Sequence, residues 1–309
     1  MRLGVLDIGS NTVHLLVAQA RPGGRPLART SEKSVLRLMR FIDPDGAISP
    51  DGVRAILDAV IRAKAVAEAE GVEELLATAT SAVREATNGP AVIAQIEEQL
   101  GQQLQVLGGD EEAIFTFLAV RRWFGWSAGQ ILLFDIGGGS LEIATGSEEL
   151  PEFARSVQLG AGRMTIAHFD EDPPGDDRVE RLRKHAREVL APVARDIAAL
   201  PRPDHVVGSS KTIRSLAKLA GHPMPGWTGI ERMVLRRDLL GSWIPVLARI
   251  PAASRQELPG ITADRTFQIT AGAVVLHEAM TAVGVDELEV SPWALREGVL
   301  LRFIEELGW

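Results

Sequence analysis

Two short turns of glycine and hydroxyl residues each begin with an aspartate at the end of an apolar segment. The first reads DIGSNT from Asp7, and the second reads DIGGGS from Asp135. Glycine leaves no side chain between backbone N–H groups and a bound anion, and hydroxyls can surround phosphate oxygens. Either turn alone could be a simple tight turn, but the pair predicts a two-sided phosphate clamp. Its expected grips are Gly9, Ser10, Asn11, Thr12, Gly137, Gly138, Gly139 and Ser140.

Carboxylates beside these turns predict a binding site for a divalent cation. Asp7 and Asp135 each end a strand-like segment, and Glu142 lies two residues past Ser140. Mg²⁺ is a hard cation that carboxylates, waters and phosphate oxygens satisfy. We therefore expect Asp7, Asp135 and Glu142 to hold Mg²⁺, with Mn²⁺ as a substitute. The alternative is that the aspartates cap their own turns and that Glu142 is exposed on a strand.

An acidic pair, Glu111 and Glu112, opens a predicted helix after two glycines and Asp110. Acidic residues are favourable there in any case, because they meet the positive end of the helix dipole. Hydrolysis of a phosphoanhydride, however, needs a carboxylate that orients the attacking water and takes its proton. These residues by themselves leave both interpretations open.

Basic side chains near predicted strand ends could neutralise phosphate oxygens. Any one of them could equally be a surface ion-pair partner. His14, in an apolar strand, is expected to be half-buried rather than a metal ligand. The basic candidates are Arg84, Lys211, Arg214, Arg265 and Arg296.

An internal repeat relates the two turns. Residues 3–15 align without gaps with residues 131–143, at an offset of 128. Residues 75–84 align with residues 205–214 at an offset of 130, and both segments join an apolar strand to hydroxyl residues and a helix start. Two matches at nearly the same offset predict duplicated halves.

Each half reads as two strands joined by a turn and followed by alternating strands and helices, which is typical of an α/β fold. A dinucleotide-binding site is excluded, because the strand-like LEIAT follows the second turn. No Ser/Gly-rich linker divides the halves, so we expect a hinge near 115–125, and a solvated loop at 170–177. Helices are expected at about 50–70, 90–100, 111–124, 177–200, 212–220, 236–249, 266–283 and 292–307.

The composition limits the class of protein. With 309 residues, of which 46% are hydrophobic and 24% charged, the chain is long enough for two ordinary domains. It has no cysteine, which excludes thiolate nucleophiles and thiolate metal sites. A net charge of −8 argues against nucleic acid as a partner. The chain shows no basic leader and no apolar run of about 18 residues, so we expect a cytoplasmic protein without a membrane span.

Together these motifs resemble those of the exopolyphosphatase and guanosine pentaphosphate phosphohydrolase family, a branch of the sugar kinase, Hsp70 and actin superfamily. The resemblance runs from Met1 to about Gly298. The order and spacing of the motifs distinguish this family from sugar kinases and chaperones, which share the paired turns but need an adenosine pocket. The matching segments are residues 7–12 with His14, 80–84, 109–113, 135–140 with Glu142, 208–214, 263–265 and 295–298.

The resemblance implies two actin-like, ribonuclease H-like domains with the active site in the cleft between them. The first would span residues 1–117 and be completed by a helix at 297–309, and the second would span residues 118–296. The family also suggests a homodimer. Because the sequence ends at Trp309, we expect the short two-domain form of the family, with a preference for short chains of substrate.

The implied activity is magnesium-dependent hydrolysis of the terminal phosphate of inorganic polyphosphate. Glu112 would be the catalytic base, with Arg84 as a phosphate contact beside it, and Asp135 and Glu142 as magnesium-associated carboxylates. Lys211 stands where many members have glycine, which either adds a phosphate contact or blocks a nucleoside. The catalytic set is then Glu112, Arg84 and Glu142. Further phosphate contacts are expected from Ser210, Lys211 and Arg265.

Three alternatives stay open at this point. An enzyme of the same fold could act on guanosine pentaphosphate in the stringent response, and guanosine penta- or tetraphosphate could be a substrate or an inhibitor. A noncatalytic sensor could bind polyphosphate or guanosine tetraphosphate, but the presence of every expected carboxylate disfavours it. An ATP-dependent kinase of the superfamily would need an adenosine site near Gly208.

Overall fold

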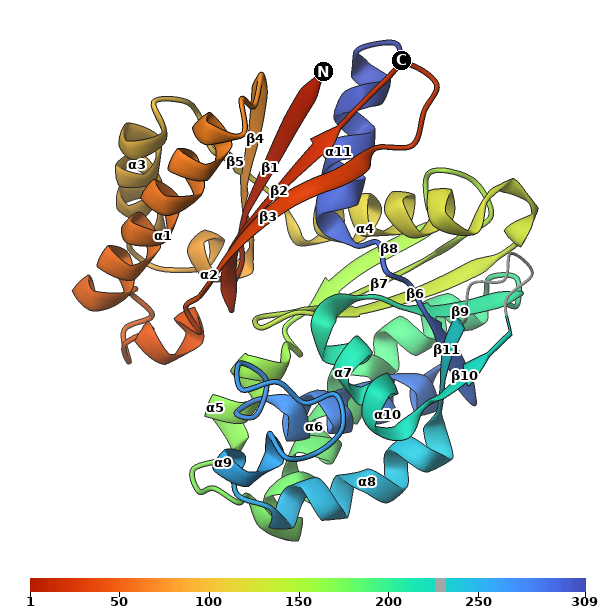
Figure 1. Ribbon diagram of the computed structural model, residues 1–309. Coiled ribbons are helices and arrows are strands. Elements are labelled where there is room, and N and C mark those ends of the chain that lie inside the picture. Colours follow the sequence, from red (N-terminus) through yellow and green to blue (C-terminus); the bar gives the residue numbers. More distant parts are fainter. Residues whose placement is uncertain (226–231) are drawn as a thin grey trace.

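Two β-sheets organise the chain (Figure 1). A computed structural model describes residues 1–225 and 232–309. The strands of the first sheet are β1 (Arg2–Ile8), β2 (Thr12–Gln19), β3 (Leu27–Val35), β4 (Glu74–Ala79) and β5 (Gln105–Val106). The strands of the second sheet are β6 (Ile131–Ile136), β7 (Leu141–Gly146), β8 (Phe153–Val157), β9 (His205–Gly208), β10 (His222–Met224), β11 (Arg232–Arg236) and β12 (Glu287–Val290).

Helices lie between and around these strands, so the expected α/β class is confirmed. The helices are α1 (Pro50–Ala69), α2 (Ser81–Arg84), α3 (Gly89–Leu100), α4 (Gly109–Phe124), α5 (Ala161–His168), α6 (Gly175–Ala198), α7 (Ser210–Ala220), α8 (Arg237–Arg249), α9 (Ala252–Arg255), α10 (Ile269–Ala282) and α11 (Leu295–Glu306). Two 3-10 helices, η1 (Leu38–Phe41) and η2 (Trp126–Ala128), complete the elements. All eight expected helices are present. The short helices α5 and α9 were not predicted, and of α2 the repeat predicted only the start, because these helices show too few turns for a clear period.

The first sheet has the strand order β3-β2-β1-β4-β5 and is covered on both faces near its centre. Leu6 and Ile8 of β1 pack in the core that includes α1, while Leu3 and Val5 pack with α11 on the other face. Alternate residues of a strand point to opposite faces, so β1 must be apolar along its length to sit between two layers. This burial fixes the strand that ends at the first turn.

The second sheet has the order β10-β11-β12-β9-β6-β7-β8. Helix α10 contacts α5, α6, α7 and α8, and nearly every one of its residues is buried. A helix that is apolar on all sides is stable in water only inside such a layer of helices. One helix of this layer, α7, contacts β6, the strand that leads into the second turn.

The predicted repeat is confirmed by the strand pairing. In the first half, β1 pairs antiparallel with β2 and parallel with β4. In the second half, β6 pairs antiparallel with β7 and parallel with β9. A helix begins just after each parallel partner, α2 after β4 and α7 after β9. The two halves therefore present equivalent strand ends to each other.

Helices α4 and α11 connect the two halves. The chain leaves the first half through α4 and returns from β12 into α11, which packs against α4 and β1 (Figure 1). Helix α4 also contacts β6, β7 and β8 of the second sheet. The placement of α11 beside β1 is what completion of the first domain by this helix would require. The division at residues 117 and 118 stays a prediction.

The expected solvated loop at 170–177 is exposed over residues 170–172, but its last residues form the first turn of α6. The exposed Asp172 also accepts a hydrogen bond from the buried Arg255 at 2.8 Å. A buried guanidinium requires such a partner.

In the described part of the chain, no helix has both the length and the apolar character needed to cross a membrane.

Candidate active site

The two glycine-rich turns are closed by the same hydrogen bond. Gly9 N donates to Thr12 O, and Gly137 N donates to Ser140 O, both at 2.9 Å. The turns also face each other closely, since a Cβ added to Gly138 would lie 3.0 Å from Ser10 Cβ. Glycine at this position lets the two turns approach.

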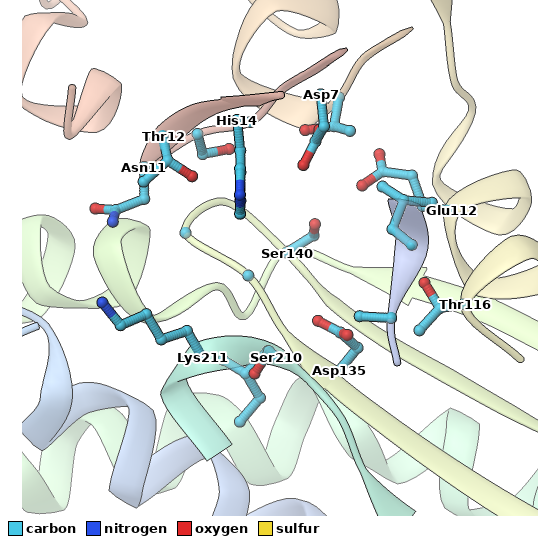
Figure 2. Close-up of a pocket in the computed structure, with 18 of the residues that line it drawn as sticks. Asp7, Asn11, Thr12, His14, Glu112, Thr116, Asp135, Ser140, Ser210 and Lys211 are labelled. Carbon is cyan, nitrogen blue, oxygen red and sulfur yellow. The ribbon is translucent and has the colours of Figure 1, made fainter. Parts of the chain in front are cut away.

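A cavity of about 280 Å³ lies between the halves, and both turns line it (Figure 2). Of the sequence-predicted site residues, it brings together Asp7, Gly9, Ser10, Asn11, Thr12, Glu112, Asp135, Gly137, Gly138, Ser140, Glu142, Ser210, Lys211 and Arg265. Arg84 and Gly139 are the two predicted residues that do not line it. The basic candidates Arg214 and Arg296 line it too.

The two acidic residues at the start of α4, Glu111 and Glu112, make different contacts. Glu111 Oε2 accepts a hydrogen bond from Gly108 N at 2.6 Å, so this carboxylate caps the helix. Glu112 is only 6% exposed, lines the cavity and accepts a hydrogen bond from Arg84 Nη1 at 2.5 Å. Of the two, Glu112 is therefore the one that faces the cavity.

Arg84 reaches Glu112 from the last residue of α2. Its Nη1 also donates to the carbonyl oxygen of Leu107. Both bonds come from Nη1, and Arg84 lies outside the cavity lining. Its expected contact with phosphate stays a prediction, and the contact seen in the structure is with Glu112.

Burial and mutual repulsion shift the carboxylates of the cavity toward their protonated forms. Burial, followed by the charge of Glu142, raises the pKa of Glu112 to about 9, against the opposing effect of Arg84. Burial and the charge of Asp135 raise the pKa of Glu142 to about 7. Burial raises the pKa of Asp135 to about 6 and raises that of Asp7 as well. A cation would relieve this repulsion, because it favours the charged forms.

Each of the other carboxylates has a polar neighbour on another element. Ser156 Oγ donates to Glu142 Oε1 at 2.8 Å, and Ser209 Oγ donates to Asp135. Arg296 Nη1 lies 3.5 Å from Asp7 Oδ2. The second oxygen, Asp7 Oδ1, is buried and has no hydrogen-bond partner among the described residues. A buried carboxylate oxygen without a partner is a candidate cation ligand.

The predicted metal set is not a ready-made three-ligand site. Asp135 and Glu142 are paired residues of β6 and β7, whereas Asp7 belongs to β1 of the other half. Within residues 1–225 and 232–309, no three acidic or histidine side chains converge closely enough to hold an ion by themselves. That Asp7, Asp135 and Glu142 hold Mg²⁺ stays a prediction, in which waters and phosphate oxygens complete the coordination.

Several residues that line the cavity were not predicted. Thr80 and Ser81 begin α2, and Ser81 Oγ lies 2.9 Å from Ser10 Oγ. The repeat could have identified Thr80, because Ser210 is its counterpart in the second half. Thr116 follows Glu112 by one turn of α4, while Lys33 of β3 gave no signal, because nothing in its strand distinguishes it from a surface lysine. The other unpredicted lining residues are Ile136, Ala294 and Leu295.

His14 is half-buried, as expected, and lines the cavity. Burial and the charges of Arg296 and Lys33 lower the pKa of His14 to about 3, so the imidazole stays neutral. Three basic residues around it, Arg214, Arg296 and Lys211, contribute to the positive potential on this side. The cavity therefore has both acidic and basic walls, which suits a phosphate chain accompanied by a cation.

Fold and cavity together define a class of protein: two actin-like halves whose glycine-rich turns face each other across a carboxylate-lined cleft. The chain belongs to the Ppx/GppA phosphatase family, whose sequence profile matches residues 16–307.

Known proteins similar to this chain support both the family and the fold. Exopolyphosphatase 1 of Mycobacterium tuberculosis H37Rv is 45% identical over 306 residues, covering 99% of this chain and 89% of that protein. Guanosine-5′-triphosphate,3′-diphosphate pyrophosphatase of Aeromonas hydrophila is 25% identical, covering 96% and 58%. The crystal structure of an exopolyphosphatase from Cytophaga hutchinsonii has a TM-score of 0.87 at 25% identity, covering 99% and 98%. The two-domain actin-like fold is thus confirmed.

Proposed function

We propose that this chain is an exopolyphosphatase, which hydrolyses the terminal phosphate of inorganic polyphosphate with the help of Mg²⁺. The observation that carries the proposal is the position of Glu112, a buried carboxylate held by Arg84 at the wall of a cavity that two phosphate turns share. The 45% identity to an exopolyphosphatase over nearly the whole chain supports the choice of substrate.

The donor set fits a divalent cation. Asp7 offers a buried oxygen that has no hydrogen-bond partner among the described residues, and Asp135 lies across the cavity from it (Figure 2). Glu142 also lines the cavity. We propose that Asp7 and Asp135 hold Mg²⁺, with Glu142 nearby, and that Mn²⁺ can substitute. The bound ion would neutralise charge on the phosphate oxygens and favour the ionised carboxylates.

The residues of the chain would then divide the work of hydrolysis. Backbone N–H groups and hydroxyls of the two turns hold successive phosphates, with Ser210, Lys211 and Arg265 as further contacts. Glu112 accepts a proton from the water that attacks the terminal phosphorus, and Arg84 keeps its carboxylate oriented. The bond from phosphorus to the bridging oxygen breaks, and the shortened chain leaves with that oxygen. Most of the rate acceleration would come from orientation and charge stabilisation.

The test is phosphate release from polyphosphate with Mg²⁺, measured for the wild type, Glu112→Gln and Glu111→Gln. Loss of general-base assistance should lower kcat of Glu112→Gln by about 10²- to 10⁴-fold. Glu111→Gln is the matched control, because it changes the neighbouring carboxylate, which caps the helix outside the cavity lining. Full turnover by Glu112→Gln would show that another group is the base.

A second candidate substrate is guanosine pentaphosphate. It is favoured by the 25% identity to the Aeromonas pyrophosphatase, but that protein is more distant and the chain covers 58% of it. Comparing phosphate release from guanosine pentaphosphate, short polyphosphate and long polyphosphate under the same conditions distinguishes the two candidates and tests the preference for short chains. Inhibition by guanosine tetraphosphate in the same assay would test a link to the stringent response.

Two further expectations stay predictions. A homodimer would be detected by sedimentation of the purified protein, and a cytoplasmic location by cell fractionation. A noncatalytic sensor is disfavoured, because the cavity contains every expected carboxylate.

A further inference from the structure

Asp264 lies between the ammonium groups of two lysines that come from different halves. Lys33 Nζ, on β3, donates to Asp264 Oδ2 at 2.8 Å. Lys211 Nζ, in the first turn of α7, donates to both carboxylate oxygens at 2.9 Å. Both lysines line the cavity, whereas Asp264 does not. We refer to these three residues as the Lys33–Asp264–Lys211 clasp.

The clasp carries more positive than negative charge. Arg265 Nε lies 3.6 Å from Asp264 Oδ2, so three cationic side chains surround one carboxylate. The side chains of Lys33 and Lys211 are 27% and 32% exposed, while that of Asp264 is 12% exposed. Because both ammonium groups are partly exposed, a ligand can reach them, and the largely buried carboxylate gives way only to an anion that supplies comparable charge to both lysines. Phosphate oxygens are suitable replacements.

The positions of the clasp and of Glu112 indicate the direction in which a bound phosphate chain would extend. Figure 2 shows Lys211 and Glu112 at opposite sides of the labelled group, with the turn of Ser140 between them. A terminal phosphate attacked beside Glu112 and gripped by the turns would leave the rest of its chain to extend toward the lysines. A short chain would end before it reached them.

We propose that Lys33 and Lys211 form a distal phosphate subsite that Asp264 occupies until a sufficiently long polyphosphate chain displaces its carboxylate. This inference rests on the proposed function and deepens it, because Asp264 then sets how affinity depends on chain length. Since the two lysines belong to different halves, a phosphate that replaces Asp264 also joins the halves across the cleft. Asp264 is in this sense a specificity-determining residue rather than a catalytic one.

The first test compares Asp264→Asn with Asp286→Asn. The control removes the same charge from an exposed ion pair with Arg237, away from the cavity lining. In Asp264→Asn we expect KM for long-chain polyphosphate to fall about three- to tenfold, because both lysines are released for substrate. KM for tripolyphosphate should stay at the wild-type value, and kcat should change less than KM. The KM for long chains should also become more sensitive to salt.

The second test measures binding without turnover. Calorimetric titration of Glu112→Gln with long-chain polyphosphate, with and without Asp264→Asn, should show tighter binding in the double variant. Adding Lys33→Met should weaken binding and remove the effect of Asp264→Asn. The subsite is overturned if Asp264→Asn matches Asp286→Asn in both KM and binding, or if Lys33→Met changes neither. Tighter binding without phosphate release from the wild type would support the subsite and reject the proposed activity instead.

Discussion

At the residue scale, Glu111 and Glu112 are adjacent in the sequence but have different partners. Successive residues of an α-helix are rotated by about 100°, so neighbouring side chains leave the helix in different directions. Glu111 turns back to the N-terminus of α4 and caps it, and Glu112 faces the cavity. The same rotation puts Thr116, one turn later, on the cavity side with Glu112.

Arg84 offers a prediction at this scale, because it acts through Glu112. Replacing it by methionine removes the donor that orients the carboxylate and leaves the cavity lining intact. We expect kcat for polyphosphate hydrolysis to fall about 10- to 100-fold, a part of the full general-base contribution, with little change in KM. Steady-state kinetics measure kcat and KM separately and so test this expectation. Arg84→Lys should recover part of kcat, and a rise confined to KM would instead indicate that Arg84 binds phosphate directly.

At the element scale, strand pairing and turn closure place the acidic groups. Asp135 pairs with Glu142 across β6 and β7, so one hairpin supplies two carboxylates to the cavity. The equivalent pair in the first half is Asp7 with His14. The two hairpins therefore carry three acids and one neutral imidazole, and two of these acids belong to the second half.

The contact between α11 and α4 gives a prediction for an element. A Cβ at Gly298 would overlap the backbone carbonyl of Phe115, which cannot move without shifting α4. We expect Gly298→Ala to lower the free energy of unfolding by about 1–3 kcal/mol. Denaturant titration measures this loss. Gly241→Ala is the control, because a Cβ there meets only the His277 ring at 3.0 Å and alanine favours a helix by about 1 kcal/mol. Equal stability of the two variants would contradict the packing argument.

At the scale of the whole molecule, cross-cleft contacts hold the halves together in addition to α4 and α11. Arg163 Nη2 of α5 lies 2.5 Å from Glu85 Oε2, and Gly139 of the second turn lies against the hydroxyls of Ser10 and Ser81 in the first half. These contacts are polar and few compared with the separate apolar cores of the two halves. An interface of this kind can open and close around a ligand.

The stability of the second half should depend on pH through Glu278. This carboxylate is 1% exposed, and although burial raises its pKa, hydrogen bonds from His277 and Arg187 and the charge of Arg183 outweigh that effect and lower it to about 2. A lowered folded-state pKa stabilises the protein above the unfolded value of 4.5, and this contribution disappears as pH falls toward 2.

The lowered folded-state pKa of Glu278 gives a prediction for Glu278→Gln. The variant should be less stable than the wild type by roughly 2 kcal/mol near neutral pH, and the difference should shrink between pH 4.5 and 2. Thermal unfolding at several pH values measures it. Glu287→Gln, an exposed residue on β12, is the control. A difference that does not depend on pH would mean that packing, rather than the charge, is responsible.

The sequence alone determined the local features of this protein. The repeated turns, the eight long helices, the α/β class and most cavity-lining residues follow from patterns within short segments, since glycine geometry and hydrophobic periodicity are local properties. The aspartate of each turn was predictable for the same reason. These patterns also carry the family resemblance that the comparisons bear out.

Only the tertiary structure decided what depends on contacts between distant segments. It gave Glu111 and Glu112 different partners, engaged Arg84 with Glu112, and brought Lys33 to the cavity. Lys211, ambiguous in the sequence, is paired with Asp264. Such partnerships join residues far apart in the chain, and no local pattern records them, because they depend on how the two halves fold against each other.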